Sequence, residues 1–243
     1  MIYDTKGHIK NEIILDPKLH LPDTRIISFW YSLKENRIGC TNNDYSISFW
    51  DFSDKFKYEK SFHYNSEDLQ DQIYYIGFCS KWLTVDQTYK IWFFDVENHT
   101  KSETLPGLHK ENIIDVCEIA QYRLVAVSSL DKQLLFWNLD LKTLVRKIVV
   151  KSVSIHSLAY LHDYQVLAAA SFANTIQLWS FGNQDIISIG TLKGHSGQVI
   201  WIQSLVDTPL LVSADELGMI KTWDVRSQKC VQSFLNESRT IFK

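Results

Sequence analysis

The sequence predicts an all-β protein, and three observations support this fold class. Tryptophan, tyrosine and phenylalanine are frequent, with 8, 11 and 13 copies in 243 residues, and aromatic residues favour strands. Short alternating apolar runs occur throughout the chain, separated by polar turn clusters, whereas runs with a helical period are hard to find. A tryptophan also ends such a run at a nearly constant interval.

The tryptophan spacing predicts the architecture. The intervals are 42, 45, 42 and 44 residues, between Trp50, Trp92, Trp137, Trp179 and Trp223. Internal repeats of about 40–45 residues are typical of β-propellers built from four-stranded blades. The sequence therefore predicts a single domain over residues 1–243, with five four-stranded antiparallel blades and each tryptophan near the end of a third strand.

The innermost and outermost strands follow from the same alignment. Apolar runs open 24 residues before four of the tryptophans, at Ile26, Ile113, Ile155 and Val199, and the shorter second repeat opens at Ile73. The strand after each tryptophan is predicted to be outermost, over Tyr58–His63, Lys101–Leu105, Leu144–Val150, Asp185–Leu192 and Cys230–Leu235. The segments "HIKNEIILD" and "SRTIFK" predict one further strand at each end.

Short motifs point to a family. The repeat "LKGHSGQVIWIQSLVDTPLLVSADELGMIKTWDVRSQKCVQSF" carries Gly194-His195 near its start and Trp223-Asp224 at the end of its third strand, and Trp50-Asp51 is a second full pair. With five such repeats in phase, the chain resembles the WD-repeat (WD40) family of β-propellers. The resemblance implies a non-catalytic scaffold that binds peptides or proteins on the faces of the propeller. The last repeat is also similar to repeats of large ciliary and cytoskeletal WD-repeat proteins.

One group of residues matches an active site in residue type. His109, Ser129 and Asp131 are the residue types of a hydrolytic triad, but no G-x-S-x-G elbow surrounds the serine. The resemblance implies that they join Trp137 in a hydrogen-bonded network that holds a blade, so they are predicted to be structural. The fifth repeat has Leu217 in the column of Asp131, and that blade is expected to lack the turn aspartate. Blades without the histidine are expected to be held mainly by packing.

A partner-binding surface is predicted at the ends of the loops. The residue before each innermost strand is polar, and these residues are Arg25, Gln72, Asn112, Ser154 and Gln198. The preceding loop delivers the chain to the rim of the central channel, so these groups are predicted to form a ring that binds a partner. Ordinary polar loop ends are the alternative. The acidic segment Asn65–Gln72 is a second candidate surface.

Composition argues against other classes of function. A net charge of −3 and a pI near 6.2 argue against a nucleic-acid partner. The four cysteines form no C-x-x-C pair, and neither a metal site, a cofactor nor an enzymatic activity is predicted. No apolar run approaches the ~18 residues of a membrane span. A cytoplasmic location is predicted, with association with the cytoskeleton or a cilium as the narrower expectation.

The number of blades leaves three arrangements open. A propeller of seven blades needs roughly 300 residues, more than this chain holds. The chain is therefore interpreted as a propeller fragment or domain of a larger cytoskeletal, ciliary or trafficking protein, as an open arc completed by further blades or by self-association, or as a closed ring of five blades.

Overall fold

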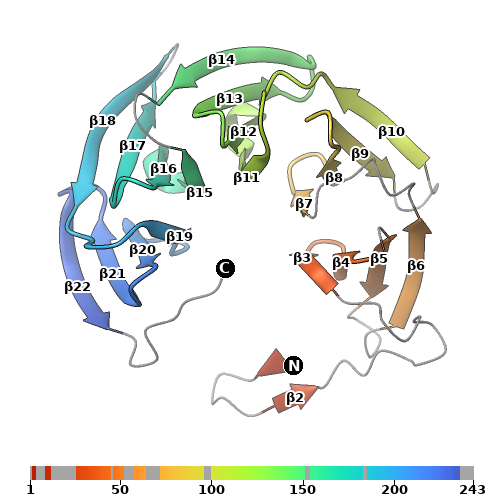
Figure 1. The fold of residues 1–243 in the computed structure, drawn as a ribbon, viewed down its shortest axis with the longest axis horizontal. Coiled ribbons are helices and arrows are strands. Elements are labelled where there is room, and N and C mark those ends of the chain that lie inside the picture. The colour runs from red at the N-terminus through yellow and green to blue at the C-terminus, as the bar shows by residue number, and fades with distance from the viewer. Residues whose placement is uncertain are drawn as a thin grey trace. The chain divides into compact units, whose positions relative to one another are not determined.

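The fold consists of small antiparallel sheets. The computed structural model describes residues 2–3, 9–11, 26–44, 46–51, 57–63, 72–95, 100–150, 154–182 and 185–235. The chain divides into two compact units, Met1–Pro106 and Gly107–Lys243. Five sheets have four strands each, and in every one the strands follow chain order from one edge to the other (Figure 1). The predicted all-β class and the predicted five four-stranded blades of a β-propeller are confirmed.

The first unit contains two blades and a short hairpin. The hairpin pairs β1 (Ile2–Tyr3) with β2 (Ile9–Asn11). The first blade consists of β3 (Ile26–Ser32), β4 (Arg37–Asn42), β5 (Ser46–Asp51) and β6 (Lys57–His63). The second blade consists of β7 (Ile73–Ile76), β8 (Lys81–Val85), β9 (Ile91–Asp95) and β10 (Thr100–Leu105).

The second unit contains three blades. The third blade consists of β11 (Ile113–Ile119), β12 (Leu124–Ser129), β13 (Gln133–Asn138) and β14 (Thr143–Val149). The fourth consists of β15 (Ile155–Leu161), β16 (Val166–Ser171), β17 (Thr175–Phe181) and β18 (Ile186–Lys193). The fifth consists of β19 (Val199–Ser204), β20 (Leu210–Asp215), β21 (Met219–Asp224) and β22 (Lys229–Leu235). Single turns of 3-10 helix, η1 (Ala120–Tyr122) and η2 (His162–Tyr164), follow β11 and β15.

The strand predictions agree closely with these bounds. The innermost strands begin at the five predicted residues, and the outermost strands agree with the predicted segments to within one residue at either end. The shorter second repeat is compressed mainly in its innermost strand, since β7 has four residues where β11 and β15 have seven. The predicted strand in "HIKNEIILD" corresponds to β2, while "SRTIFK" lies outside the described residues.

Apolar side chains between adjacent blades form the core of the second unit. One buried cluster joins the third and fourth blades and includes Phe136 and Trp179. A second cluster joins the fourth and fifth blades and includes Leu178 and Trp223. Trp179 and Trp223 thus each pack on the preceding blade, because alternate residues of a strand point to opposite faces of its sheet. Burial of such a side chain contributes about 1.5–3 kcal/mol to stability.

In the first unit, a glycine permits the closest packing between the two blades. A Cβ atom on Gly39 would lie 2.5 Å from the ring of Trp82, and Trp82 is only 1% exposed. Trp82 belongs to the buried core between these two blades.

Bulges near the start of the innermost strands connect neighbouring blades. The register shifts between Ile113 and Asp115 on β11 and between Ile155 and Ser157 on β15. Asp115 Oδ2 accepts the backbone N–H of Leu158 at 2.8 Å, and Ser157 Oγ accepts that of Ile202 at 3.3 Å. The innermost strand is an edge of its sheet, and here side chains of the preceding blade accept two of its backbone N–H groups.

Within the described part of the chain, no helix has the length and apolar character that a membrane span requires.

Candidate functional site

The predicted loop-end residues of the second unit occupy equivalent positions. Each backbone carbonyl accepts the N–H of the residue after a second strand, in the pairs Asn112–Leu130, Ser154–Phe172 and Gln198–Glu216, at 3.0, 3.3 and 3.0 Å. The shared hydrogen bond places the three residues at the same edge of successive blades.

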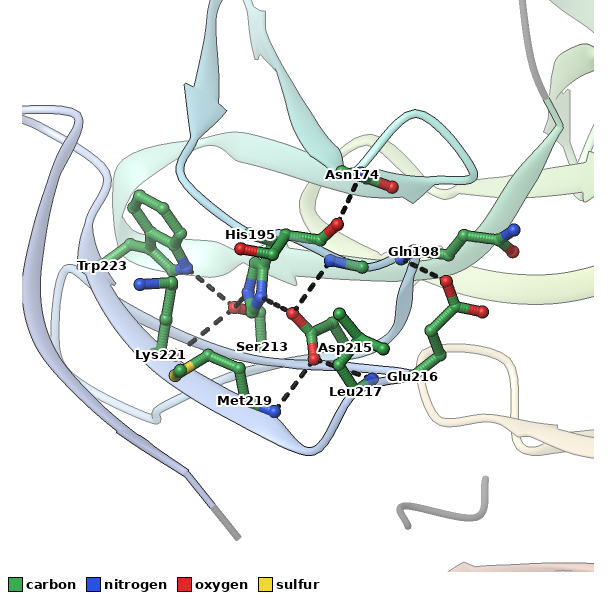
Figure 2. Close-up of polar contacts among 12 residues, drawn as sticks. Asn174, His195, Gln198, Ser213, Asp215, Glu216, Leu217, Met219, Lys221 and Trp223 are labelled. Carbon is green, nitrogen blue, oxygen red and sulfur yellow. Dashed lines mark hydrogen bonds and ion pairs between the residues drawn. The ribbon is translucent and has the colours of Figure 1, made fainter. Parts of the chain in front are cut away.

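Their side chains differ in availability. Asn112 is exposed, and the half-buried Gln198 extends its side chain away from the nearby buried network (Figure 2). Ser154 is only 9% exposed, and its hydroxyl donates to the carbonyl of Leu130 at 3.0 Å. In the first unit, Gln72 Oε1 accepts the hydroxyl of Tyr74. Arg25 lies outside the described residues. Asn112 and Gln198 are thus the described members that a partner reaches most easily.

A buried polar network holds the fifth blade together (Figure 2). His195 Nδ1 lies 2.8 Å from Asp215 Oδ2, and His195 Nε2 lies 2.7 Å from Ser213 Oγ. The indole N–H of Trp223 donates to the same serine oxygen at 2.8 Å. Asp215 Oδ1 also accepts the backbone N–H groups of Leu217 and Met219, at 3.1 and 2.9 Å, so the carboxylate closes the β20–β21 turn.

The electrostatics of this network favour a neutral histidine. Burial lowers the pKa of His195, and the neighbouring Asp215 carboxylate opposes this shift only in part. Burial raises the pKa of Asp215, but the hydrogen bonds from His195 and from the backbone outweigh it and hold that pKa below its usual value. The arrangement fits an imidazole that donates from Nδ1 to the carboxylate and accepts the Ser213 hydroxyl at Nε2.

The predicted network of the third blade is less complete. His109 Nδ1 lies 3.1 Å from Asp131 Oδ2, and Asp131 Oδ1 accepts the backbone N–H of Gln133 at 3.0 Å. The Ser129 hydroxyl instead donates to the carbonyl of Glu111 at 2.9 Å. His109 Nε2 is buried without a hydrogen-bond partner, and burial lowers the pKa of this histidine despite the nearby carboxylate. The structure brings His109 and Asp131 together and places Trp137 in the core, at 2% exposure.

The expectation that the fifth blade lacks its turn aspartate is wrong. Asp215 has the role there that Asp131 has in the third blade, because both carboxylates bind a histidine and close the turn after a second strand. Counting backward from the tryptophan missed it, because Asp215 stands two positions earlier than Asp131 does. It occupies the register position of Ser129, since Ile113 pairs with Ser129 and Val199 pairs with Asp215. The order serine, any residue, aspartate occurs at Ser213–Asp215 and Ser129–Asp131, but the copy in the fifth blade lies two positions earlier along its second strand.

Two blades without the histidine also have polar anchors. The Trp92 indole donates to Asp86 Oδ2 at 2.6 Å, and Asp86 Oδ1 accepts the backbone N–H of Thr88 at 2.7 Å. The Trp50 indole donates to Ser48 Oγ at 3.4 Å. Hydrogen bonds therefore add to packing in these blades, because a buried indole N–H requires an acceptor.

The histidine–aspartate pairs are closed to substrate. The side chains of His195 and Asp215 are 1% and 0% exposed, and those of His109 and Asp131 are 3% and 4% exposed. A general base must reach a proton of the substrate, and neither histidine has the exposure to do so. Over the described ranges, no group of three or more His, Cys, Asp or Glu side chains could hold a metal ion.

Comparisons with known proteins agree with this geometry. Residues 187–224 match the family model of the WD domain, G-beta repeat. The chain is 23% identical over 148 residues to cilia- and flagella-associated protein 337 B of Tetrahymena thermophila, which is 61% of this chain and 12% of that protein. It is 27% identical over 117 residues to apoptotic protease-activating factor 1 of Homo sapiens, covering 48% of this chain and 9% of the relative. Target of rapamycin complex subunit LST8 of Saccharomyces cerevisiae is 26% identical over 104 residues, which is 43% of this chain and 34% of the subunit.

Repeat, blades and relatives define the class of protein. Residues 187–224 form a WD repeat, and the described part of the chain has five four-stranded blades of the β-propeller type. The matched stretches span about a tenth of the first two relatives, 12% and 9% of their lengths. WD40 propellers are generally non-catalytic.

Proposed function

We propose that this chain is a non-catalytic scaffold that binds a peptide or protein partner at the polar loop ends of its blades. The repeated position of Asn112, Ser154 and Gln198 carries the proposal, because one backbone hydrogen bond sets the same edge in three successive blades. Arg25 and Gln72 precede the other two innermost strands and complete the proposed ring by analogy. Amide side chains both donate and accept hydrogen bonds, so they suit the backbone of an extended peptide.

The names of two relatives support a scaffold function. One is a complex subunit, and another is associated with cilia and flagella. A domain within a larger ciliary, cytoskeletal or trafficking protein is the second candidate, favoured by the match to 12% of the Tetrahymena protein. A location in the cytoplasm or at a cilium is part of the same proposal.

Partner capture tests the loop ends. Proteins bound to the tagged chain from a cell lysate are identified by mass spectrometry, and the recovery of each is compared with that on the Asn112→Ala/Gln198→Ala variant. We expect at least ~10-fold lower recovery of specific partners, about 1.4 kcal/mol, with an unchanged melting temperature. Gln121→Ala changes an exposed residue of η1, at the other end of the inner strand, and should leave recovery unchanged.

The separate variants Arg25→Ala and Gln72→Ala extend the test to the first unit. Arg25 should have the largest single effect, because arginine is enriched among interface hot spots. If capture survives the double variant and these changes but is lost when residues 65–72 are replaced by a neutral segment, the partner binds the acidic loop and the proposed ring is wrong.

A further inference from the structure

The junctions between the blades of the second unit differ at the far end of the inner strands. At the junction of the third and fourth blades, Tyr122 stacks on Phe181 with ring centroids 5.4 Å apart, and Tyr160 meets the same ring edge-on at 5.6 Å. The Tyr122 hydroxyl donates to the carbonyl of Phe181 at 3.2 Å. Three aromatic rings therefore fill this junction.

The next junction lacks two of these three rings. Phe181 and Val225 are equivalent, because their backbone N–H groups donate to the carbonyls of Gln165 and Pro209 in the same way, at 3.1 and 3.0 Å. Tyr160 and Ser204 are equivalent by strand register, since they pair with Leu167 and Leu211. Only Tyr164, the counterpart of Tyr122, keeps its ring at the junction of the fourth and fifth blades.

A groove lies beside Ser204, where the ring of Tyr160 has no counterpart. Its volume is about 240 Å³, and it is lined by Tyr160–Tyr164 and Ser204–Thr208. Leu205 and Val206, at one wall, are 40% and 83% exposed. The lining includes Asp163 and Asp207 but neither lysine nor arginine. The lining also includes His162, whose Nδ1 lies 3.3 Å from Asp163 Oδ1, and the nearby Arg226 is paired with Asp224 at 3.1 Å. The groove is therefore apolar at one wall and carries the carboxylate of Asp207 beside the His162–Asp163 pair.

We propose that this groove, defined by the two lining segments, binds an arginine side chain of a partner peptide whose neighbouring residue is aliphatic. The ring missing at Ser204 is planar, and guanidinium is the planar cation among side chains. It can stack against a tyrosine ring and pair with a carboxylate at the same time. The contact of the Arg226 guanidinium with the Tyr164 ring, 5.8 Å from its centroid, shows that this ring accepts such a group within the molecule. The aliphatic neighbour would cover Leu205 and Val206.

This site is separate from the proposed loop-end ring. Asn112 and Gln198 precede the inner strands β11 and β19, whereas the groove residues end or follow β15 and β19 at the opposite edge of the blades. Each proposal can therefore fail without the other.

Peptide titrations followed by amide NMR test the groove. The probes are acetylated, amidated Ser-Leu-Arg-Val-Ser and matched peptides with citrulline, lysine or phenylalanine at the central position. Citrulline keeps the plane without the charge, and lysine keeps the charge without the plane. We expect saturable shifts at the amides of residues 162–164 and 205–208 with the arginine peptide, and about fivefold weaker binding of the lysine and citrulline peptides.

Three variants locate the binding. Ser204→Tyr installs the ring that Tyr160 supplies at the other junction, and it should abolish the shifts. Asp207→Asn should weaken binding about fivefold, and asparagine tolerates the left-handed backbone at this position, where φ is 57°. Glu216→Gln, at the opposite edge, is the matched control and should have no effect. The proposal is overturned if the wild-type groove amides do not shift, if citrulline or phenylalanine peptides bind as well as the arginine peptide, or if Ser204→Tyr and Asp207→Asn both leave binding unchanged.

Discussion

The two histidine networks of the second unit should contribute very differently to stability. Ser213 Oγ is within 2.8 Å of both His195 Nε2 and the Trp223 indole nitrogen, and the serine is 0% exposed. Ser213→Ala leaves both buried groups without this partner. One unsatisfied buried polar group costs about 1–3 kcal/mol, so we expect Ser213→Ala to lower the free energy of unfolding by about 3 kcal/mol.

The same serine-to-alanine change in the third blade, Ser129→Ala, should destabilise the fold less. Ser129 Oγ contacts only backbone groups, the carbonyl of Glu111 and the N–H of Asp131, at 2.9 and 3.1 Å. Glu111 is exposed, so water can replace the hydroxyl at its carbonyl. We expect Ser129→Ala to cost about 1 kcal/mol, although sequence alone ranks the third blade as the better formed.

Urea unfolding followed by circular dichroism and tryptophan fluorescence measures both changes. A double-mutant cycle of Ser213→Ala with Trp223→Phe should give a coupling free energy of at least ~1 kcal/mol. The parallel cycle of Ser129→Ala with Trp137→Phe should give a value near zero. Equal costs for the two serine variants, or equal couplings in the two cycles, would refute the assignment of the complete network to the fifth blade.

Three further predictions follow from the same geometry. Burial holds the pKa of His195 and His109 below the unfolded value near 6.5, so near and below this pH the unfolded chain binds more protons at these residues than the folded chain does. The free energy of unfolding should therefore fall as the pH drops below about 6.5. Urea melts at a series of pH values measure this dependence, and His195→Gln should flatten it. Trp137→Ala should cost about 3–5 kcal/mol and His109→Ala about 1–3 kcal/mol, and unchanged urea midpoints for both would contradict a structural role. The isolated chain should self-associate through β3, because Ile26 and Phe29 are 44% and 63% exposed. Their counterparts in β15, Ile155 and Leu158, are only 1% and 7% exposed. Light scattering should show an apparent mass above that of a monomer, which Phe29→Ser should reduce, whereas a compact wild-type monomer would favour a closed ring of five blades.

The sequence by itself determined the class, the number and the strand order of the blades. Alternation and repeated tryptophans are local signals that recur in every blade, and one weak motif gains specificity when it returns in phase five times. For the same reason, the innermost strands begin where the pattern predicts. Packing of Trp179 and Trp223 on the preceding blade follows from the same alternation.

Only the tertiary structure decided which polar residues meet. Ser129 and Ser213 both stand two residues before an aspartate, yet Ser213 lies two positions earlier along its strand, at the place that Val127 has in the third blade. Only Ser213 therefore meets the histidine, while the Ser129 hydroxyl binds a backbone carbonyl. The groove likewise depends on residues from different blades, about 40 positions apart, whose proximity no local pattern encodes. Tyr160 and Ser204 are unremarkable in the sequence, and only the packing of neighbouring blades shows that one fills a junction and the other leaves it open.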